Sequence, residues 1–426
     1  MRKAYRTASA VDLTVKYKLK LKDRIVCYEE NGHRSVPLEK TIKNIENFFL
    51  RSPVEVQFTF FNKRSGKINQ AYLKYHSPIN KLKDQHFFGK GLNADQNIAS
   101  TCFEFFERLS AQIRPDDLIK EASFNELTDN AIDPRQFILP RNIKYHKEKK
   151  IDWTPGYSLS RKMPFWVPAN LVFCPYNPQE HEKYLGITDS NGLAAGNNIE
   201  EAILHGLLEV IERDQIFISE YNRLPFERIT RISIPEVCNP VIEHLEKLDF
   251  QVLLLSGTTD IPVPFFAAFI HHKSKPTECS VAYGCHLDPT IAIERALTEA
   301  IQLLPPSYNH TNWYKSGAPQ FYSGNPADEI QFKTIKNKAT FNIKENIEIL
   351  VSLLKRIDSE VIVVDLSRPD ILFPAVRVLA TKLQPYIHKD AVRLSDRFFN
   401  VPVKLGLRRH PVPVSDVKIW PICGYK

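Results

Sequence analysis

The sequence has few cysteines, and none of them forms a CxxC pair. They are scattered along the chain and odd in number: Cys27, Cys102, Cys174, Cys238, Cys279, Cys285 and Cys423. Such a set argues against a disulfide framework and against a zinc site built on paired thiolates. We therefore expect reduced thiols and a cytoplasmic protein.

Long apolar runs and glycine-rich repeats are also missing. The longest apolar stretches are too short to cross a bilayer, and the 29 prolines and 15 glycines follow no collagen-like period. Hydrophobic residues still make up 43% of the 426 residues, which is enough to bury a substantial core. We expect a chain that is folded throughout, without membrane spans.

The common nucleotide and hydrolase motifs are absent. The sequence contains no GxxxxGK[ST] loop, no GxGxxG turn that opens a helix after a strand, and no GxSxG nucleophile elbow. His271, His272 and His286 lie near Cys279 and Cys285, but their spacing matches no standard metal site. Any nucleotide or metal site must therefore use a less common arrangement.

Positive charge is concentrated at the N-terminus. The formal net charge is +8, and most of it lies in the first 24 residues. Within residues 13–22 lysines alternate with apolar residues, a period of two that is typical of a half-buried strand with a lysine face. We favour this interpretation over nucleic-acid binding, and the alternation also argues against a signal peptide.

The pattern along the chain predicts a mixed α+β fold. A strand-rich N-terminal lobe is expected over residues 1–80, with a helix near 38–50 and a strand at 54–61, followed by a larger domain over 81–426. The proline-rich stretch from 130 to 190 suits short strands and loops. A helix ending near Lys355 precedes a buried strand at 361–366.

Three predicted helices each carry polar residues on one face and apolar residues on the other. The polar faces comprise Ser100, Glu104, Glu107 and Arg108; Glu201, His205, Glu209 and Glu212; and Arg295, Thr298, Glu299 and Gln302. Shifting the first helix by 105 residues superposes Gly91 on Gly196 and Glu104 on Glu209. We interpret this as an internal duplication of a unit in which a glycine turn precedes a helix.

Carboxylates one turn apart repel each other and need compensation. One interpretation is a solvated face on which Arg108 and Arg213 supply the counter-charge. The other is a magnesium-nucleotide site, because carboxylates hold Mg²⁺ and arginine grips phosphate. The stripes contain no lysine, and similar glycine turns precede two of the helices, which favours the nucleotide site.

These residues together resemble the YcaO superfamily. The resemblance rests on Gly89-Lys90-Gly91 with the Ser100-x3-Glu104-x2-Glu107-Arg108 helix, on the segment 190–214, and on the segment 296–302. It implies an ATP-binding fold whose acidic helices hold ATP and Mg²⁺. It also implies that a peptide backbone amide is activated by phosphorylation of its oxygen, giving azoline heterocycles or thioamides in a ribosomally made peptide.

The resemblance also implies roles for individual residues. Arg213 and Gln302 are expected at the reacting groups, and Ser100, Glu104, Arg108, Asn197 and Glu201 are expected to join them in contacting the nucleotide or its metals. The acidic cage for Mg²⁺ is expected to consist of Glu104, Glu107, Glu201, Glu209, Glu212 and Glu299.

A separate partner is expected to bind the leader of the substrate peptide, either an E1-like or a TfuA-like protein. Two rival functions stay open. One is an ATP-dependent carboxylate-amine ligase that uses the same cage, and the other is a non-catalytic homologue that binds a peptide through its basic N-terminal strand. We do not expect a membrane or nucleic acid as partner, and the oligomeric state, a homodimer included, is left open.

Overall fold

The computed structural model describes residues 6–7, 18–27, 32–52, 55–62, 69–76, 85–127, 130–176, 183–186, 188–304, 318–323, 329–386 and 393–417. The chain forms two compact units that interleave in sequence. Unit 1 comprises residues 1–24, 106–214 and 342–397, and unit 2 comprises 25–105, 215–341 and 398–426. The expected N-terminal lobe is divided between them, so a domain boundary at residue 80 stays a prediction.

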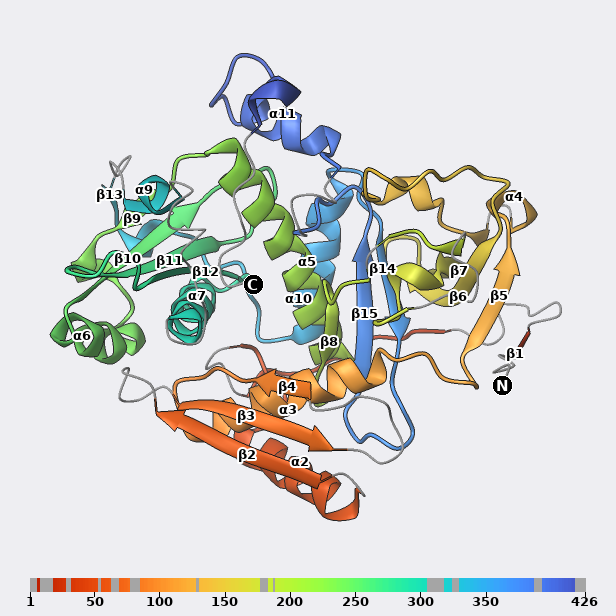
Figure 1. The fold of residues 1–426 in the computed structure, drawn as a ribbon, viewed down its shortest axis with the longest axis horizontal. Helices are drawn as coiled ribbons and strands as arrows, with labels where there is room; N and C mark the ends of the chain where they lie inside the picture. Colours follow the sequence, from red (N-terminus) through yellow and green to blue (C-terminus); the bar gives the residue numbers. More distant parts are fainter. Residues whose placement is uncertain are drawn as a thin grey trace. The chain divides into compact units, whose positions relative to one another are not determined.

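Unit 1 is built on a seven-stranded sheet in the order β1-β5-β6-β14-β15-β8, with β7 paired to β6 (Figure 1). Its strands are β1 (Arg6–Thr7), β5 (Leu118–Ala122), β6 (Ile151–Ser158), β7 (Met163–Pro168), β8 (Leu193–Ala195), β14 (Val361–Asp365) and β15 (Ala375–Ala380). Only the β1–β5 pair is parallel. The four apolar residues of β14 are all buried, as expected of a central strand.

Helix α10 (Ile343–Lys355) leads into that central strand. The side chain of Asn342 caps it by accepting a hydrogen bond from the Lys344 amide at 3.1 Å. Ile343, Ile347 and Leu350 are fully buried on one face of the helix, which is the spacing of an amphipathic helix packed on a core. The predicted succession of a helix and then a buried strand is confirmed.

Unit 2 contains a five-stranded sheet in the order β12-β11-β10-β9-β13. Its strands are β9 (Glu227–Ile229), β10 (Phe250–Gly257), β11 (Phe265–His272), β12 (Cys279–Cys285) and β13 (Glu329–Ile330). Helices α6 (Asn239–Lys247) and α7 (Pro289–Leu303) share one apolar cluster with β10, β11 and β12. They therefore pack on the same face of this sheet.

A second, three-stranded antiparallel sheet in unit 2 consists of β2 (Glu55–Asn62), β3 (Asn69–His76) and β4 (Gln85–Phe88). Helix α2 (Leu38–Arg51) and the first turns of α3 (Ala94–Ser110) pack beside this sheet. Phe105 of α3 packs against Phe87 at 5.4 Å and against Phe49 at 6.0 Å between ring centroids. These aromatic contacts join α2, β4 and α3 into one core.

Helix α5 (Ile199–Asn222) is the longest helix among the described residues. The remaining helical segments are α4 (Phe124–Leu127), α9 (Ala318–Ser323) and α11 (Asp396–Lys404), with short 3₁₀ turns η2 (Pro134–Gln136), η3 (Ala169–Leu171), η5 (Arg231–Ser233), η6 (Glu236–Cys238), η7 (Phe332–Thr334) and η9 (Val414–Asp416). In the part of the chain that the structure describes, no helix is both long and apolar enough to cross a membrane.

The predicted strand over residues 13–22 is wrong where the structure describes it. Residues 18–22 are irregular, and residues 13–17 lie outside the described part. The Lys22 amide donates to Glu200 at 2.7 Å, and Arg24 Nε lies 3.1 Å from the same carboxylate. This segment is thus held by a buried side chain and not by a strand ladder.

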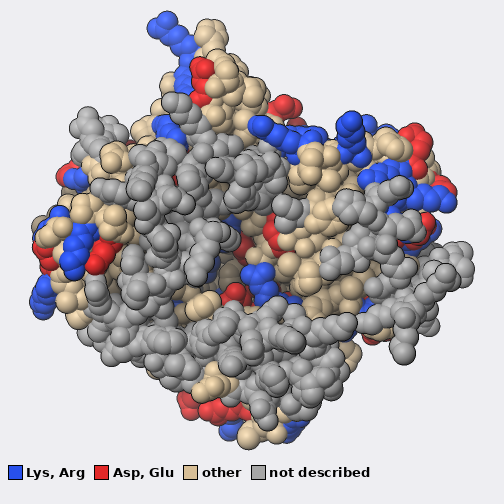
Figure 2. Space-filling model, viewed as in Figure 1, with Lys and Arg blue, Asp and Glu red and all other residues tan. Residues whose placement is uncertain are grey.

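Charged side chains of both signs are interspersed over α6, at the left of Figure 2. An ion pair between Arg231 and Glu246, 3.3 Å apart, belongs to this surface. Mixed charge of this kind is ordinary for a solvated helix. It contrasts with the one-sided carboxylate faces predicted for the candidate site.

Candidate functional site

Two of the candidate helices dock onto strands of unit 2 through a glycine. A Cβ atom on Gly89 would lie 2.2 Å from the Asn97 carbonyl oxygen, and one on Gly284 would lie 2.0 Å from the Ala292 carbonyl oxygen. Both contacts fall eight residues after the glycine. Any larger residue would push the helix off the strand, so glycine is required at both positions.

This docking gives Glu104 of α3 and Glu299 of α7 equivalent positions, each fifteen residues after its glycine. Glu104 accepts a hydrogen bond from the Phe88 amide at 2.9 Å. Glu299 forms an ion pair with Lys90, whose own amide donates to Ser100 Oγ at 3.3 Å. The glycine turn thus connects two acidic helices of unit 2.

Helix α3 begins with a reciprocal cap. Asn93 accepts from the Gln96 amide at 2.9 Å, and Gln96 in return accepts from the Leu92 amide at 2.6 Å. This is a variant of the capping box, in which the side chain of the third helical residue accepts from the amide one residue before the cap. It fixes the turn that carries Lys90.

Helix α5 begins with the same cap, 105 residues further along. Asn198 accepts from the Glu201 amide at 3.1 Å, and Glu201 accepts from the Asn197 amide at 3.2 Å. The side-chain amide of Asn197 also donates to Glu201 at 3.0 Å. The repeated cap supports the internal duplication inferred from the sequence, which remains a proposal.

The acidic residues of α5 are largely withdrawn from solvent. Glu201 is 1% exposed and Glu212 is 4% exposed. Arg213 donates to Glu209 at 3.5 Å, the outer limit of a hydrogen bond. The interpretation of a solvated face is therefore wrong for Glu201 and Glu212, because buried carboxylates need hydrogen bonds or cations.

The other candidates are partly exposed. In the last turn of α3, Arg108 Nε lies 3.7 Å from the carboxylate of its neighbour Glu107. Gln302 lies near the end of α7 and is also partly exposed. These side chains retain access to solvent and to a ligand.

The structure distributes the predicted residues over both units. Unit 2 carries Ser100, Glu104, Glu299 and Gln302, whereas unit 1 carries Glu107, Arg108, Asn197, Glu201, Glu209, Glu212 and Arg213. Within each unit the side chains are engaged with neighbouring amides and cations. Among the residues described, no three His, Cys, Asp or Glu side chains form a group arranged to hold a metal ion. The metal-ligand assignment stays a prediction.

Two residues of this region were not predicted from the sequence. Lys90 was visible only as the centre of a Gly-Lys-Gly turn, and Glu200 as one of two adjacent glutamates. Glu200 is 1% exposed and is held by Arg24 and the Lys22 amide. Helical periodicity could not predict that Glu200 is buried beside the predicted ligand Glu201. Both residues lie in the first turn of α5, where too few residues precede them to define a buried face.

Neighbouring cysteine and histidine residues have the properties expected of core groups. Burial raises the pKa of the Cys102 thiol far above its ordinary value, so this thiol stays protonated. Burial also holds the pKa of His286 well below its ordinary value. Cys102 is fully buried and acts as inert packing.

Residues 88–384 match the family model described as YcaO cyclodehydratase, ATP- and Mg²⁺-binding. The chain belongs to the YcaO family. The match covers every candidate residue from Ser100 to Gln302, and the family binds ATP and Mg²⁺, which confirms the resemblance stated from the motifs.

Related proteins extend this result. An uncharacterized protein of Methanothermobacter thermautotrophicus is 31% identical over 70% of this chain and 82% of its own length. An uncharacterized protein encoded in the tfuA 3′ region of Rhizobium leguminosarum is 29% identical over 51% of this chain and 54% of its own length. The chain thus spans about half of the second relative.

A solved heterocyclase in complex with substrate and cofactor has the same fold. Its TM-score is 0.84 and its identity 25%, and the match covers 96% of this chain and 60% of the heterocyclase. The mixed α and β architecture predicted from the sequence is thereby confirmed. The glycine-turned, acidic helices of this chain are part of a YcaO-type fold.

Proposed function

We propose that this chain uses ATP to activate a backbone amide of a peptide and closes an azoline ring. The observation that carries the proposal is the family match, which spans all three acidic helices. The likeness to a heterocyclase over 96% of the chain favours ring closure as the outcome. The substrate is then a peptide with a Cys, Ser or Thr side chain next to the reacting amide.

The chemistry of the donor groups fits ATP and Mg²⁺. Carboxylate oxygens are the ligands that Mg²⁺ prefers, and a guanidinium matches the oxygens of a phosphate. We assign Mg²⁺ binding to Glu104, Glu107, Glu201, Glu209, Glu212 and Glu299, and nucleotide contacts to Ser100, Glu104, Arg108, Asn197, Glu201, Arg213 and Gln302. When bound, Mg²⁺ offsets the charge of the transferring phosphoryl group.

The residues of the chain act mainly by positioning. We assign to Arg213, which donates to Glu209 at 3.5 Å, the role of stabilising charge on the phosphoryl group, and to Gln302 that of orienting the reacting amide. The side-chain nucleophile attacks the amide carbon and the γ-phosphoryl passes to the amide oxygen. That oxygen then leaves as phosphate, so ATP and the peptide give ADP, phosphate and the ring.

Thioamide formation is the second candidate. It is favoured by the relative encoded in the tfuA 3′ region. The same activated amide would then be attacked by a sulfide donor, and sulfur would replace oxygen. In either case we propose a separate protein, E1-like or TfuA-like, that binds the leader of the substrate peptide.

The two rivals use the same residues differently. A carboxylate-amine ligase would activate a free carboxylate and join two molecules, whereas a non-catalytic homologue would bind a peptide without consuming ATP. The acidic faces kept on all three helices disfavour the second rival, because a binding module without ATP chemistry has no need of them.

The test is turnover of an ¹⁸O-labelled peptide. The peptide is a short synthetic substrate with a Cys, Ser or Thr residue next to the target amide, labelled at the target backbone carbonyl. We expect ¹⁸O in the released phosphate and a mass loss of about 20 Da from the labelled peptide, because the heavy amide oxygen leaves with phosphate. A gain of about 14 Da over the labelled peptide would indicate the thioamide, since sulfur replaces the heavy oxygen after the same activation. Unlabelled phosphate with an unchanged peptide would refute amide activation.

A further inference from the structure

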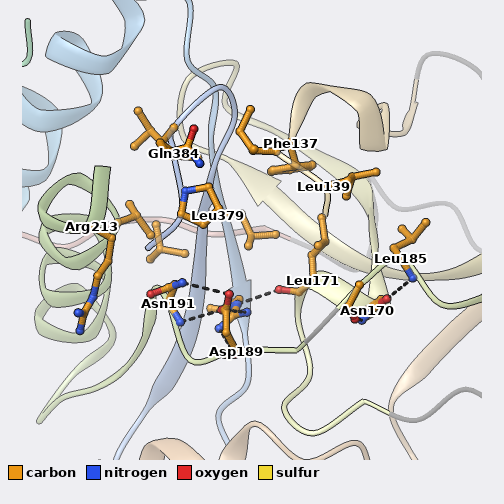
Figure 3. A pocket seen from close by; sticks show the side chains of 18 of the residues that line it. Phe137, Leu139, Asn170, Leu171, Leu185, Asp189, Asn191, Arg213, Leu379 and Gln384 are labelled. Carbon is orange, nitrogen blue, oxygen red and sulfur yellow. Dashed lines mark hydrogen bonds and ion pairs between the residues drawn. The ribbon is translucent and has the colours of Figure 1, made fainter. Parts of the chain in front are cut away.

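A cavity of about 110 Å³ lies within unit 1, beside strand β15 (Figure 3). One buried water needs about 10–15 Å³ on the same scale, so the cavity has room for a much larger group. Its walls are mainly apolar, with Phe137, Leu139, Leu171, Leu185 and Leu379 around it. Such a lining suits an apolar ligand group.

Two of the polar residues that border this cavity are bonded to each other. Arg377 Nη2 lies 3.3 Å from Asp189 Oδ1, and its other nitrogens donate to the carbonyl oxygens of Asp189 at 3.0 Å and Leu171 at 2.8 Å. The backbone and side-chain amides of Asn191 also donate to Asp189. The charges of Asp189 and Arg377 cancel, so the pair holds the wall together and does not attract a charged ligand.

Another polar residue, Asn170, forms hydrogen bonds in the cavity wall near Leu185. Asn170 accepts a hydrogen bond from the Leu185 amide, and its side-chain amide donates to the Gly186 carbonyl oxygen at 3.4 Å. Asn170 is 4% exposed. Its groups therefore fix the loop around Leu185 and leave the apolar side chains to face the cavity.

The cavity adjoins the turn of α5 that carries Arg213. Val210 and Arg213, one turn apart, both border it. In Figure 3 the guanidinium of Arg213 points away from the cavity centre, so its stem forms part of the wall. A peptide held at the guanidinium of Arg213 would have its neighbouring side chains within reach of the cavity.

We propose that this cavity binds an uncharged, apolar side chain of the substrate peptide, at a residue flanking the modified amide. The identity of the occupant, a side chain of the substrate peptide, rests on the proposed function. It adds a specificity site that is distinct from the residues assigned to ATP and Mg²⁺, apart from the shared stem of Arg213.

Binding of small probes tests the site without requiring turnover. Saturation-transfer NMR on the full chain is recorded with N-acetyl-leucinamide, N-acetyl-phenylalaninamide and N-acetyl-lysinamide. Leu171→Trp fills the cavity and Leu171→Ala enlarges it, while Leu372→Trp and Leu372→Ala make the same changes at a leucine of unit 1 that is 59% exposed and does not line the cavity. Thermal melting checks that each variant is folded.

We expect the two apolar probes to bind and the lysine probe not to bind. Leu171→Trp should weaken both apolar probes roughly tenfold, the usual effect of a steric mismatch in a small apolar pocket. Leu171→Ala should shift the preference from the leucine to the phenylalanine probe, which mere destabilisation would not do. The Leu372 variants should bind like the unmodified chain.

Three results would overturn the proposal: equal binding of the lysine probe, no binding of the apolar probes, or equal effects of the Leu171 and Leu372 variants. None of them bears on amide activation, which is read from ¹⁸O in phosphate. Conversely, size-dependent probe binding in a chain that leaves phosphate unlabelled would keep the cavity as a binding site and remove only its proposed role in catalysis.

Discussion

Lys90 and Glu299, 209 residues apart in the chain, form an ion pair in unit 2. Their side chains are 18% and 26% exposed, so the pair is partly shielded from solvent. Lys90 belongs to a glycine turn that also contacts Ser100, and Glu299 belongs to α7. Lys90 therefore provides a positive charge next to the polar face of α7, which contains no lysine of its own.

A double-mutant cycle measures the strength of this pair. Lys90→Met and Glu299→Gln should each lower the free energy of unfolding, and the double variant should lose less than their sum, with a coupling of about 0.5–1 kcal/mol. Urea unfolding of the three variants and the parent gives the coupling. Strict additivity would mean that the pair does not contribute to stability.

Nucleotide binding should depend on Mg²⁺, because without a cation the carboxylates along each helix repel one another and the phosphates. Calorimetry with ATP should show binding that disappears when EDTA is added. A matched variant, Glu243→Gln, removes an exposed carboxylate on α6 and should not change it. Equal affinity with and without Mg²⁺ would contradict the acidic cage.

Glu212→Gln should leave the fold intact and abolish turnover, since it keeps the shape of the side chain and removes one buried charge. Glu212 is only 4% exposed, and loss of like-charge repulsion should hold the melting temperature or raise it slightly. Thermal melting and ATP consumption are measured together, again with Glu243→Gln as control. A large drop in melting temperature with full activity would make Glu212 structural.

The two capping boxes predict matched losses of stability. Asn93→Ala and Asn198→Ala each remove a side chain that accepts from the third helical residue, at 2.9 Å and 3.1 Å. Each should lower the free energy of unfolding by about 1 kcal/mol, the usual contribution of an N-cap. Denaturant unfolding checks the values. A loss at one cap alone would argue against equivalent helix starts.

Stability should fall as the solution becomes acidic, partly through His286. Its ring lies 4.8 Å from that of His33, and burial lowers the pKa of both rings below the ordinary 6.5, with Arg34 adding repulsion to each. Below about pH 6.5 the unfolded chain binds protons that the folded chain does not, so stability present at higher pH is lost.

Melting temperatures at pH 7.5 and 5.5 test this dependence. In the native chain the Asp288 amide donates a hydrogen bond to His286 Nδ1 at 3.0 Å. The variant His286→Asn keeps a side-chain acceptor for this amide and removes the titrating ring. It should reduce the drop between the two pH values. His410→Gln changes an exposed histidine and should leave the drop unchanged. An identical drop in all three proteins would refute the role of His286.

Much of the candidate site could be predicted because it depends on local pattern. Helix α5 presents Glu201, Glu209 and Glu212 on one side by its 3.6-residue period, and its predicted core residues Ile203, Leu207 and Ile211 are buried. The same reasoning gave a wrong strand for residues 18–22, the described part of the lysine-rich segment. Alternation gives two faces to an extended chain but does not provide a neighbouring strand to pair with, and the Lys22 amide is instead bound by Glu200.

The sequence by itself determined the helices, the glycine turns before them and the kinds of side chain on each face, because these follow from spacing along a few turns. Only the tertiary structure decided which distant groups meet: Lys90 with Glu299, Arg24 with Glu200, and Arg377 with Asp189 at the wall of the cavity. These partners are 176 to 209 residues apart. Their pairing depends on how strands order into sheets and on which groups become buried, and neither is encoded in the period of any one segment.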